Sequence, residues 1–207
     1  MGVITVSREL GSKGTEIAHM VAERMGYECV DRELIADIAR EAGVEEAHVS
    51  GKEESISARP RIVGPEMAAF FRRQRYASRQ PREALEDQAY VELVRKVICD
   101  RAEGGNVVVL GRGGQMVLQD WSGALHVHIA APLKVRVERI AEEREISLQL
   151  AERLVRQSDR RKRSYIRHFY DNADWRNPRY YHLILDTDRI PPEVAAEIII
   201  RAAQVAD

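Results

Sequence analysis

The sequence predicts an α/β fold in which a doubly wound sheet of about five parallel strands carries helices on both faces. Two observations support this prediction. The apolar runs are short, continuous and rich in β-branched residues, as in strands that are buried on both faces. Segments with helical periodicity separate these runs. The expected strands cover residues 3–6, 27–30, 107–110, 125–129 and 181–185.

The segments between the expected strands have the periodicity and the end signals of helices. The expected helices cover residues 15–25, 32–42 and 83–103, and two further ones open at Pro132 and at Pro191-Pro192. Gly26 and Gly43 follow the first two as helix C-cap residues would. A proline costs no hydrogen bond at the first helical position, so the proline positions favour helix starts.

Two stretches depart from this alternation. Residues 49–82 are polar, arginine-rich and interrupted by prolines, which predicts an insertion that serves either as an acceptor flap or as a contact in a homo-oligomer. Residues 147–180 begin as a charged helix and continue into an aromatic segment, in which packing against the core is expected ahead of base stacking. The chain of 207 residues is long enough for one core with a lid, so residues 1–207 are expected to form a single domain.

Composition and charge narrow the class of protein. Hydrophobic residues make up 44%, charged residues 31%, and the net charge is -1, which indicates no bulk affinity for nucleic acid or membranes. Basic residues nevertheless gather in 59–82 and 153–167, which favours a small polyanionic ligand. Two cysteines suggest neither a disulfide framework nor a metal site, and no signal peptide or membrane span is expected. We therefore expect a cytoplasmic protein.

The start of the chain predicts a phosphate-binding loop between a strand and a helix. Such a loop reads G-x-x-x-x-G-K-[ST]. Here an arginine stands at the first glycine, and the Gly-Lys pair is inverted. Glycines let the backbone approach an anion, and a helix N-terminus points N–H groups at it. The candidate binding residues are Arg8, Gly11, Ser12, Lys13, Gly14 and Thr15.

The inversion moves the cation that normally contacts the phosphates. Counting along the pattern puts Gly14 at the lysine and Thr15 at the residue that binds magnesium. Lys13 is the nearest replacement for the lysine, and Arg8 is another. The alternative is an ordinary strand-to-helix turn with a solvated lysine.

Charged residues after the second and third strands are further candidates, because open α/β sheets place ligand contacts at the carboxyl ends of strands. Asp31 follows the second strand, although it would also serve as the N-cap of the next helix. Arg112 lies between glycines after the third strand, and its planar fork suits phosphate oxygens. A solvated loop arginine is the alternative.

Four arginines, at 156, 160, 163 and 167, recur at helical spacing on one face. A polyphosphate would offset their repulsion, whereas a solvated charged face, with Asp159 paired to Arg163, is the alternative. His126 and His128 face the same side of a strand, but without a third ligand a structural role is expected ahead of metal binding.

The chain resembles the cytidylate kinase-like family of P-loop proteins over nearly its whole length except 49–82. The family's opening reads I-S-R-x-x-G-S-G-G-x-x-I-A, and this chain has I-T-V-S-R-E-L-G-S-K-G-T-E-I-A. The similarity continues in V-D-R-E-L-I, N-V-V-V-L-G-R-G-G, H-V-H-I-A-A-P and Y-Y-H-L-I-L-D-T. The family itself commonly lacks the loop lysine.

The resemblance implies phosphoryl transfer from ATP, with Mg²⁺, to a nucleoside monophosphate, most plausibly CMP or dCMP. It implies that Asp31 contacts the acceptor nucleotide, that Arg112 holds the acceptor's phosphate, and that 147–180 is the lid over ATP. Within the lid, Arg160 and Arg163 are the strongest candidates for stabilising the transferred charge, together with Lys13. Asp159 is a further candidate for substrate binding and would orient the two arginines.

Two other functions remain open. The inverted Lys13-Gly14 pair favours a nucleotide-binding regulator or pseudokinase, and the atypical 49–82 region favours a kinase of a non-nucleotide metabolite.

Overall fold

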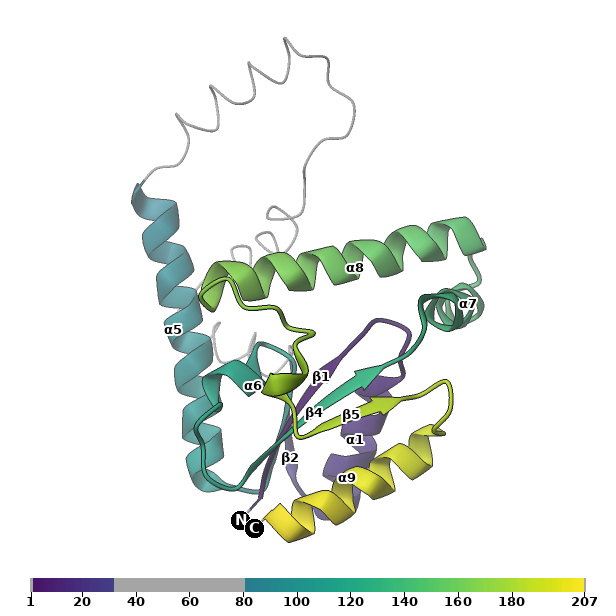
Figure 1. Ribbon diagram of the computed structural model, residues 1–207. Coiled ribbons are helices and arrows are strands. Elements are labelled where there is room, and N and C mark those ends of the chain that lie inside the picture. Colours follow the sequence, from purple (N-terminus) through teal and green to yellow (C-terminus); the bar gives the residue numbers. More distant parts are fainter. Residues whose placement is uncertain (1, 32–80, 207) are drawn as a thin grey trace.

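The computed structural model describes residues 2–31 and 81–206. Its strands are β1 (Val3–Arg8), β2 (Glu28–Val30), β3 (Val107–Leu110), β4 (Ala124–Ala130) and β5 (Leu183–Asp186). They form one sheet in the order β2-β3-β1-β4-β5, and every pairing is parallel (Figure 1). The predicted sheet of five parallel strands is therefore confirmed. Since β1 lies in the middle, the loop that follows it opens at the centre of the sheet.

Two strands begin later than the apolar runs predict. β2 begins at Glu28 because Gly26 and Tyr27 complete the end of the preceding helix, where Tyr27 N donates to Ala22 O at 2.8 Å. β5 begins at Leu183 because a 3-10 helix, η1 (Pro178–Tyr180), comes directly before it. Tyr181 then turns its side chain inward, and its hydroxyl donates to Trp175 O.

Helices cover both faces of the sheet, as a doubly wound fold requires. The helices that pack on it are α1 (Gly14–Met25) and α9 (Pro192–Ala206) on one face, and α5 (Pro81–Gly104) and α6 (Gly114–Val117) on the other. Successive residues of a strand point to opposite faces. Ile4 accordingly packs with α1 and α9, whereas Val3 packs with α5.

Two helices lie beyond the carboxyl ends of the strands. These are α7 (Leu133–Glu143) and α8 (Leu148–Phe169), and Figure 1 shows α8 crossing above the sheet. They share a small hydrophobic core of their own, against which Leu10 of the loop after β1 also packs. Ser147 caps α8 by accepting a hydrogen bond from Leu150 N. The predicted charged helix at the start of 147–180 is thus present.

Some expectations fall outside the described residues, namely the helix over 32–42 and most of the segment 49–82. In the described ranges, no helix is both long enough and apolar enough to cross a membrane.

Candidate active site

A cavity of about 1130 Å³ opens at the carboxyl ends of β1 and β3. Most of its lining comes from the loop after β1, the turn after β3, α7 and α8, and the first turn of α1, Gln115 and Trp175 complete it. The predicted site residues that line it are Arg8, Gly11, Lys13, Gly14, Thr15 and Arg112. The fold therefore brings the loop candidates and the arginine of the β3 turn to one space.

The loop after β1 presents a helix N-terminus to this cavity. Lys13 is the N-cap of α1, with φ 59° in the left-handed region, and no side chain caps the helix there. The first N–H groups of a helix have no acceptor within the helix, and they attract anions. Gly11 has φ 81°, and a Cβ there would lie 2.6 Å from Arg136 O. A glycine is needed at position 11 for this close approach to α7.

Of the predicted residues outside the lining, Ser12 and Asp31 belong to the segments after β1 and β2. Ser12 is buried beneath the loop, where its hydroxyl donates to Glu9 O at 2.7 Å, so it braces the loop from inside. Asp31 follows β2 and is half-buried at the edge of the described sheet. The roles predicted for both residues stay predictions.

The turn after β3 joins the cavity to the end of α8. Gly111, Arg112 and Gly113 all have positive φ, at 79°, 55° and 72°. A Cβ at Gly113 would lie 2.6 Å from the ring of Tyr170, and the Tyr170 hydroxyl donates to Arg112 O at 3.2 Å. The left-handed turn and the aromatic side chain therefore hold each other in place.

The basic residues of α8 divide between two faces. Arg156, Arg160, Arg163 and Arg167 are exposed, and none of them lines the cavity. Arg161 and Lys162 line it instead. The periodicity identifies a basic face correctly but does not tell which of two basic faces is turned inward. The catalytic role predicted for Arg160 and Arg163 stays a prediction.

Lys162 contacts the phosphate loop directly. Its ammonium donates to the backbone oxygen of Arg8 and lies 4.7 Å from the centre of the Trp175 ring. Burial, followed by the positive charge of Arg8, lowers the pKa of Lys162 to about 7. A bound anion would favour the charged ammonium and raise this pKa again.

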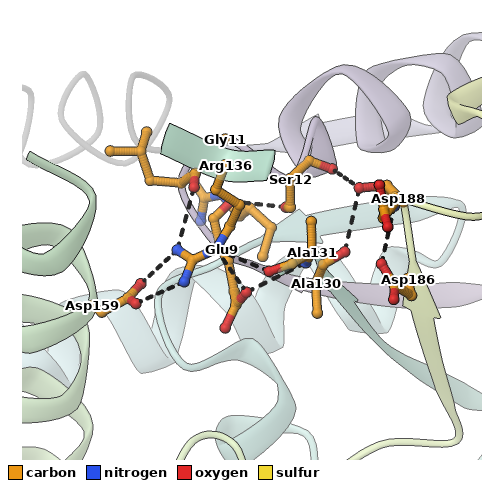
Figure 2. Close-up of polar contacts among 12 residues, drawn as sticks. Glu9, Gly11, Ser12, Ala130, Ala131, Arg136, Asp159, Asp186 and Asp188 are labelled. Atoms are coloured by element: carbon orange, nitrogen blue, oxygen red, sulfur yellow. Dashed lines mark hydrogen bonds and ion pairs between the residues drawn. The ribbon is translucent and has the colours of Figure 1, made fainter. Parts of the chain in front are cut away.

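A network of ion pairs ties the loop to α7 and α8, and Figure 2 shows its buried centre, the Arg136 side chain beside Glu9 and Asp159. The side chain of Arg136 in α7 is 4% exposed, and its Nε lies 3.1 Å from Glu9 Oε2. Its terminal nitrogens donate to both oxygens of Asp159 at 3.1 and 3.0 Å. Arg176 then bridges Glu9 at 2.6 Å and Asp159 at 2.9 Å. Each carboxylate thus lies between two cations.

This network differs from what the sequence suggested for Asp159. Its carboxylate pairs with Arg136 and Arg176, and it does not line the cavity. Sequence reasoning overlooked Glu9, Arg136 and Arg176. The sequence did contain one indication of this ion pair. Arg136 lies on the same helical face as the apolar residues Leu133, Val137 and Ile140, and a charge on a buried face needs an ion-pair partner.

A second set of contacts holds the loop from the side of β5. Arg139, which lines the cavity, donates to Thr187 Oγ1 at 3.0 Å and to Thr187 O at 2.7 Å. The Thr187 hydroxyl donates in turn to Ser12 O at 2.9 Å. The loop is therefore fixed from both α7 and the end of β5 before any ligand binds.

The two histidines of β4 lie in the protein interior. His126 Nδ1 is 2.8 Å from Thr5 Oγ1, and its ring stacks on His182 at 4.9 Å. His128 packs against Tyr181 at 4.9 Å and edge-on to Trp175 at 5.4 Å. Burial lowers the pKa of each to about 4, so both are neutral near pH 7. Within the described ranges, no group of three or more His, Cys, Asp or Glu could hold a metal ion.

Comparisons with known proteins agree with this architecture. A family model described as "Cytidylate kinase-like family" matches residues 3–189. The curated cytidylate kinase of Natronomonas pharaonis is 25% identical over 202 residues, covering 95% of this chain and 86% of that protein.

Solved structures share the fold at low sequence identity. An uncharacterized protein from Eubacterium ventriosum has a TM-score of 0.71 at 17% identity, with 99% of both chains covered. A gluconokinase from Sinorhizobium meliloti has a TM-score of 0.51 at 14% identity, with 99% of this chain and 94% of that chain covered. Together with the sheet order, the kinase likeness confirms the predicted P-loop kinase-like fold.

Proposed function

The chain belongs to the cytidylate kinase-like family, and from this premise we propose that it transfers the γ-phosphoryl group of ATP to a nucleoside monophosphate, with CMP or dCMP as the acceptor. One observation carries the proposal. The loop after β1, the Arg112 turn and the inward face of α8 line the same cavity. Phosphoryl transfer requires positioning and charge neutralisation around one centre more than it requires a covalent nucleophile.

The chemistry is a displacement at the γ-phosphorus. An oxygen of the acceptor's phosphate forms a bond to the γ-phosphorus, and the bond from that phosphorus to the bridging oxygen breaks. ADP leaves with the electron pair, and the acceptor becomes a nucleoside diphosphate. Negative charge spreads over the transferred group and the leaving oxygen, so fixed cations around the cavity would lower the barrier.

The donor would lie on the loop after β1. The N-terminus of α1 and the backbone around Gly11 and Gly14 would hold its phosphates, with Lys13 at the rim of the cavity. On the opposite wall, Arg161 and Lys162 are the α8 cations that line the cavity, so we assign the contact with the triphosphate to them. Arg160 and Arg163 remain candidates only if α8 presents another face to the bound nucleotide.

The acceptor would lie toward the other side of the cavity. Arg112, in the strained turn after β3, is the group we assign to its phosphate, since a guanidinium binds two oxygens at once. Asp31, at the end of β2, is the group we assign to its nucleoside part. Asp159, held by Arg136 and Arg176, would position α8 rather than contact the substrate.

The family implies Mg²⁺ with ATP, and the donor set is compatible with it. Thr15 is exposed in the first turn of α1 and lines the cavity, so its hydroxyl oxygen is available as a ligand. Mg²⁺ commonly takes one or two protein oxygens and completes its shell with phosphate oxygens and waters. Bound in this way, it would neutralise charge on the phosphates. The cytoplasmic location and homo-oligomerisation stay predictions.

A coupled ADP-release assay over a panel of acceptors tests the proposed function. The panel contains CMP, dCMP, the other nucleoside monophosphates and a set of sugars and sugar acids. We expect CMP or dCMP to give the highest kcat/KM. Turnover with a sugar alone would favour a metabolite kinase. ATP binding without turnover would favour a pseudokinase, a function that the glycine at position 14 also favours.

Two variants locate the acceptor site within this assay. Arg112→Met is expected to raise the KM for the acceptor about tenfold or more while changing the KM for ATP less, because a charge-assisted hydrogen bond contributes roughly 1.5–3 kcal/mol. Arg201→Met removes an exposed arginine of α9, far along the chain from the cavity lining, and is the matched control.

A further inference from the structure

Position 14 of the loop has no room for the lysine of the standard pattern. An ideal Cβ at Gly14 would lie 2.3 Å from Arg8 Cβ, 3.1 Å from Arg8 Cγ and 3.1 Å from Ile129 Cβ. Ile129 is completely buried in β4, so close packing leaves it little room to move aside. A side chain at position 14 and the side chain of Arg8 therefore compete for the same space.

The side chain of Arg8 extends from Gly14 to the turn after β3. Its terminal nitrogen Nη1 would lie 2.1 Å from an ideal Cβ at Gly111, which has φ 79°. Gly111 is itself fixed, because its N–H donates to Val6 O at 2.9 Å. Two glycines that are distant in the sequence thus leave space for one arginine, and its guanidinium reaches the turn that contains Arg112.

The positive charge of Arg8 also acts on titratable groups of two other elements. Burial, followed by the positive charge of Arg8, lowers the pKa of Lys162 in α8. Burial and Asp31 raise the pKa of Cys29 in β2, and the charge of Arg8 opposes this rise. Arg8 therefore lies within electrostatic reach of the donor loop, the inward face of α8 and the end of β2. Arg8 and Lys162 are like charges on the wall of one cavity, and phosphate oxygens would offset their repulsion.

Lys13 has a different place in the loop. It is exposed, and its backbone has φ 59°, a conformation that favours glycine. In the standard pattern a glycine stands at this position. The inversion thus puts a lysine where the backbone requires the left-handed region and a glycine where the lysine side chain would collide with Arg8.

We infer that Arg8 takes the place of the phosphate-loop lysine, with Gly14 and Gly111 as the glycines that make room for its side chain, and that its guanidinium binds the donor's terminal phosphates. This assignment rests on the proposed function and deepens it. A guanidinium offers two parallel N–H donors to phosphate oxygens, whereas an ammonium acts as a point charge. Arg8 would therefore fix the orientation of the transferred group as well as neutralise it.

Exchange of the two residues tests this inference. The variants are Arg8→Gly, Gly14→Lys and the double variant that restores the standard arrangement, and each is measured for ATP affinity and for kcat/KM. We expect each single variant to lose about tenfold or more in ATP affinity, since a hydrogen bond to a charged group contributes roughly 1.5–3 kcal/mol. The double variant is expected to bind ATP at least about tenfold more tightly than Gly14→Lys alone.

Arg8→Met and Lys13→Gly decide between the two candidate cations. Arg8→Met is expected to reduce kcat/KM more than Lys13→Gly, with the melting temperature recorded for both. Arg24→Met, at an exposed position in the last turn of α1, is the control and should match the wild type. A larger loss in Lys13→Gly than in Arg8→Met would overturn the inference, as would a double variant no better than Gly14→Lys. A wild type that neither binds nor turns over ATP would instead refute the proposed function itself.

Discussion

Replacing Arg136 by methionine should be among the most destabilising single changes at this site. Arg136 is 3% exposed and pairs with Glu9 and with both oxygens of Asp159. It also donates to Ala131 O at 3.1 Å and to Leu10 O at 3.4 Å. Methionine fills much of the space but leaves two carboxylates sharing the single guanidinium of Arg176.

The expected loss follows from burial of the partners. The Glu9 side chain is 7% exposed and that of Asp159 is 19% exposed, so water cannot fully replace the lost cation. Removal of one partner from a buried ion pair typically costs about 3–5 kcal/mol. At about 2–4 °C per kcal/mol for a chain of this size, the melting temperature should fall by roughly 6–20 °C.

Chemical denaturation of the wild type and the variant measures this loss as a shift of the midpoint. Arg156→Met is the matched control, because Arg156 pairs with Glu152 at 2.8 Å on the exposed face of α8. An exposed i,i+4 pair contributes only about 0.3–0.5 kcal/mol. If Arg136→Met costs no more than Arg156→Met, then the network does not stabilise the fold, and the reasoning from burial is wrong.

Three further predictions concern pH, proton uptake and backbone strain. Because the pKa values of His126 and His128 fall from 6.5 to about 4 on folding, the unfolded chain takes up protons first as the pH falls, and stability should decrease between pH 6.5 and 4. The free energy of unfolding should fall by about 3 kcal/mol per histidine over this range. Unfolding measured at several pH values checks this, and a His128→Gln variant whose stability changes with pH as steeply as that of the wild type would contradict it. Because the pKa of Lys162 is about 7, ATP binding at pH 8 should take up protons, and calorimetry in buffers of different ionisation enthalpy should show uptake that Lys162→Met lacks. Gly113→Ala should destabilise the fold more than Gly26→Ala, because both glycines have positive φ but only a Cβ at position 113 would meet Tyr170. Gly104→Ala should be tolerated. Equal melting temperatures for Gly113→Ala and Gly26→Ala would refute the contact with Tyr170.

The sheet and its two covered faces could be predicted from the sequence because buried parallel strands and amphipathic helices have distinct periodicities. Tyr181 shows the limit of this reasoning. It belongs to an apolar run, but a short helix and a hydrogen bond to Trp175 place it before the strand. Local composition does not reveal such a tertiary contact.

Part of the candidate site could be predicted from the positions of the strands. The loop and Arg112 follow strands directly, so the position of the strand predicts the place of the side chain. Which basic residues of α8 line the cavity depends on how this helix is rotated against α7, and the sequence does not reveal that rotation. The ion-pair partners of Glu9 are more than a hundred positions away in the sequence, so local patterns do not reveal them either. The reason for the inverted Lys13-Gly14 pair also lies outside the loop motif, in the space that the Arg8 side chain occupies.

Transfer of label from γ-³²P ATP to CMP tests the proposed phosphoryl transfer most directly. Wild-type protein, ATP, Mg²⁺ and CMP or dCMP are incubated together, and the products are separated by chromatography. We predict that the label appears in CDP or dCDP in amounts equal to the ADP formed. Label that stays in ATP, or that appears only as free phosphate, would contradict transfer to CMP or dCMP.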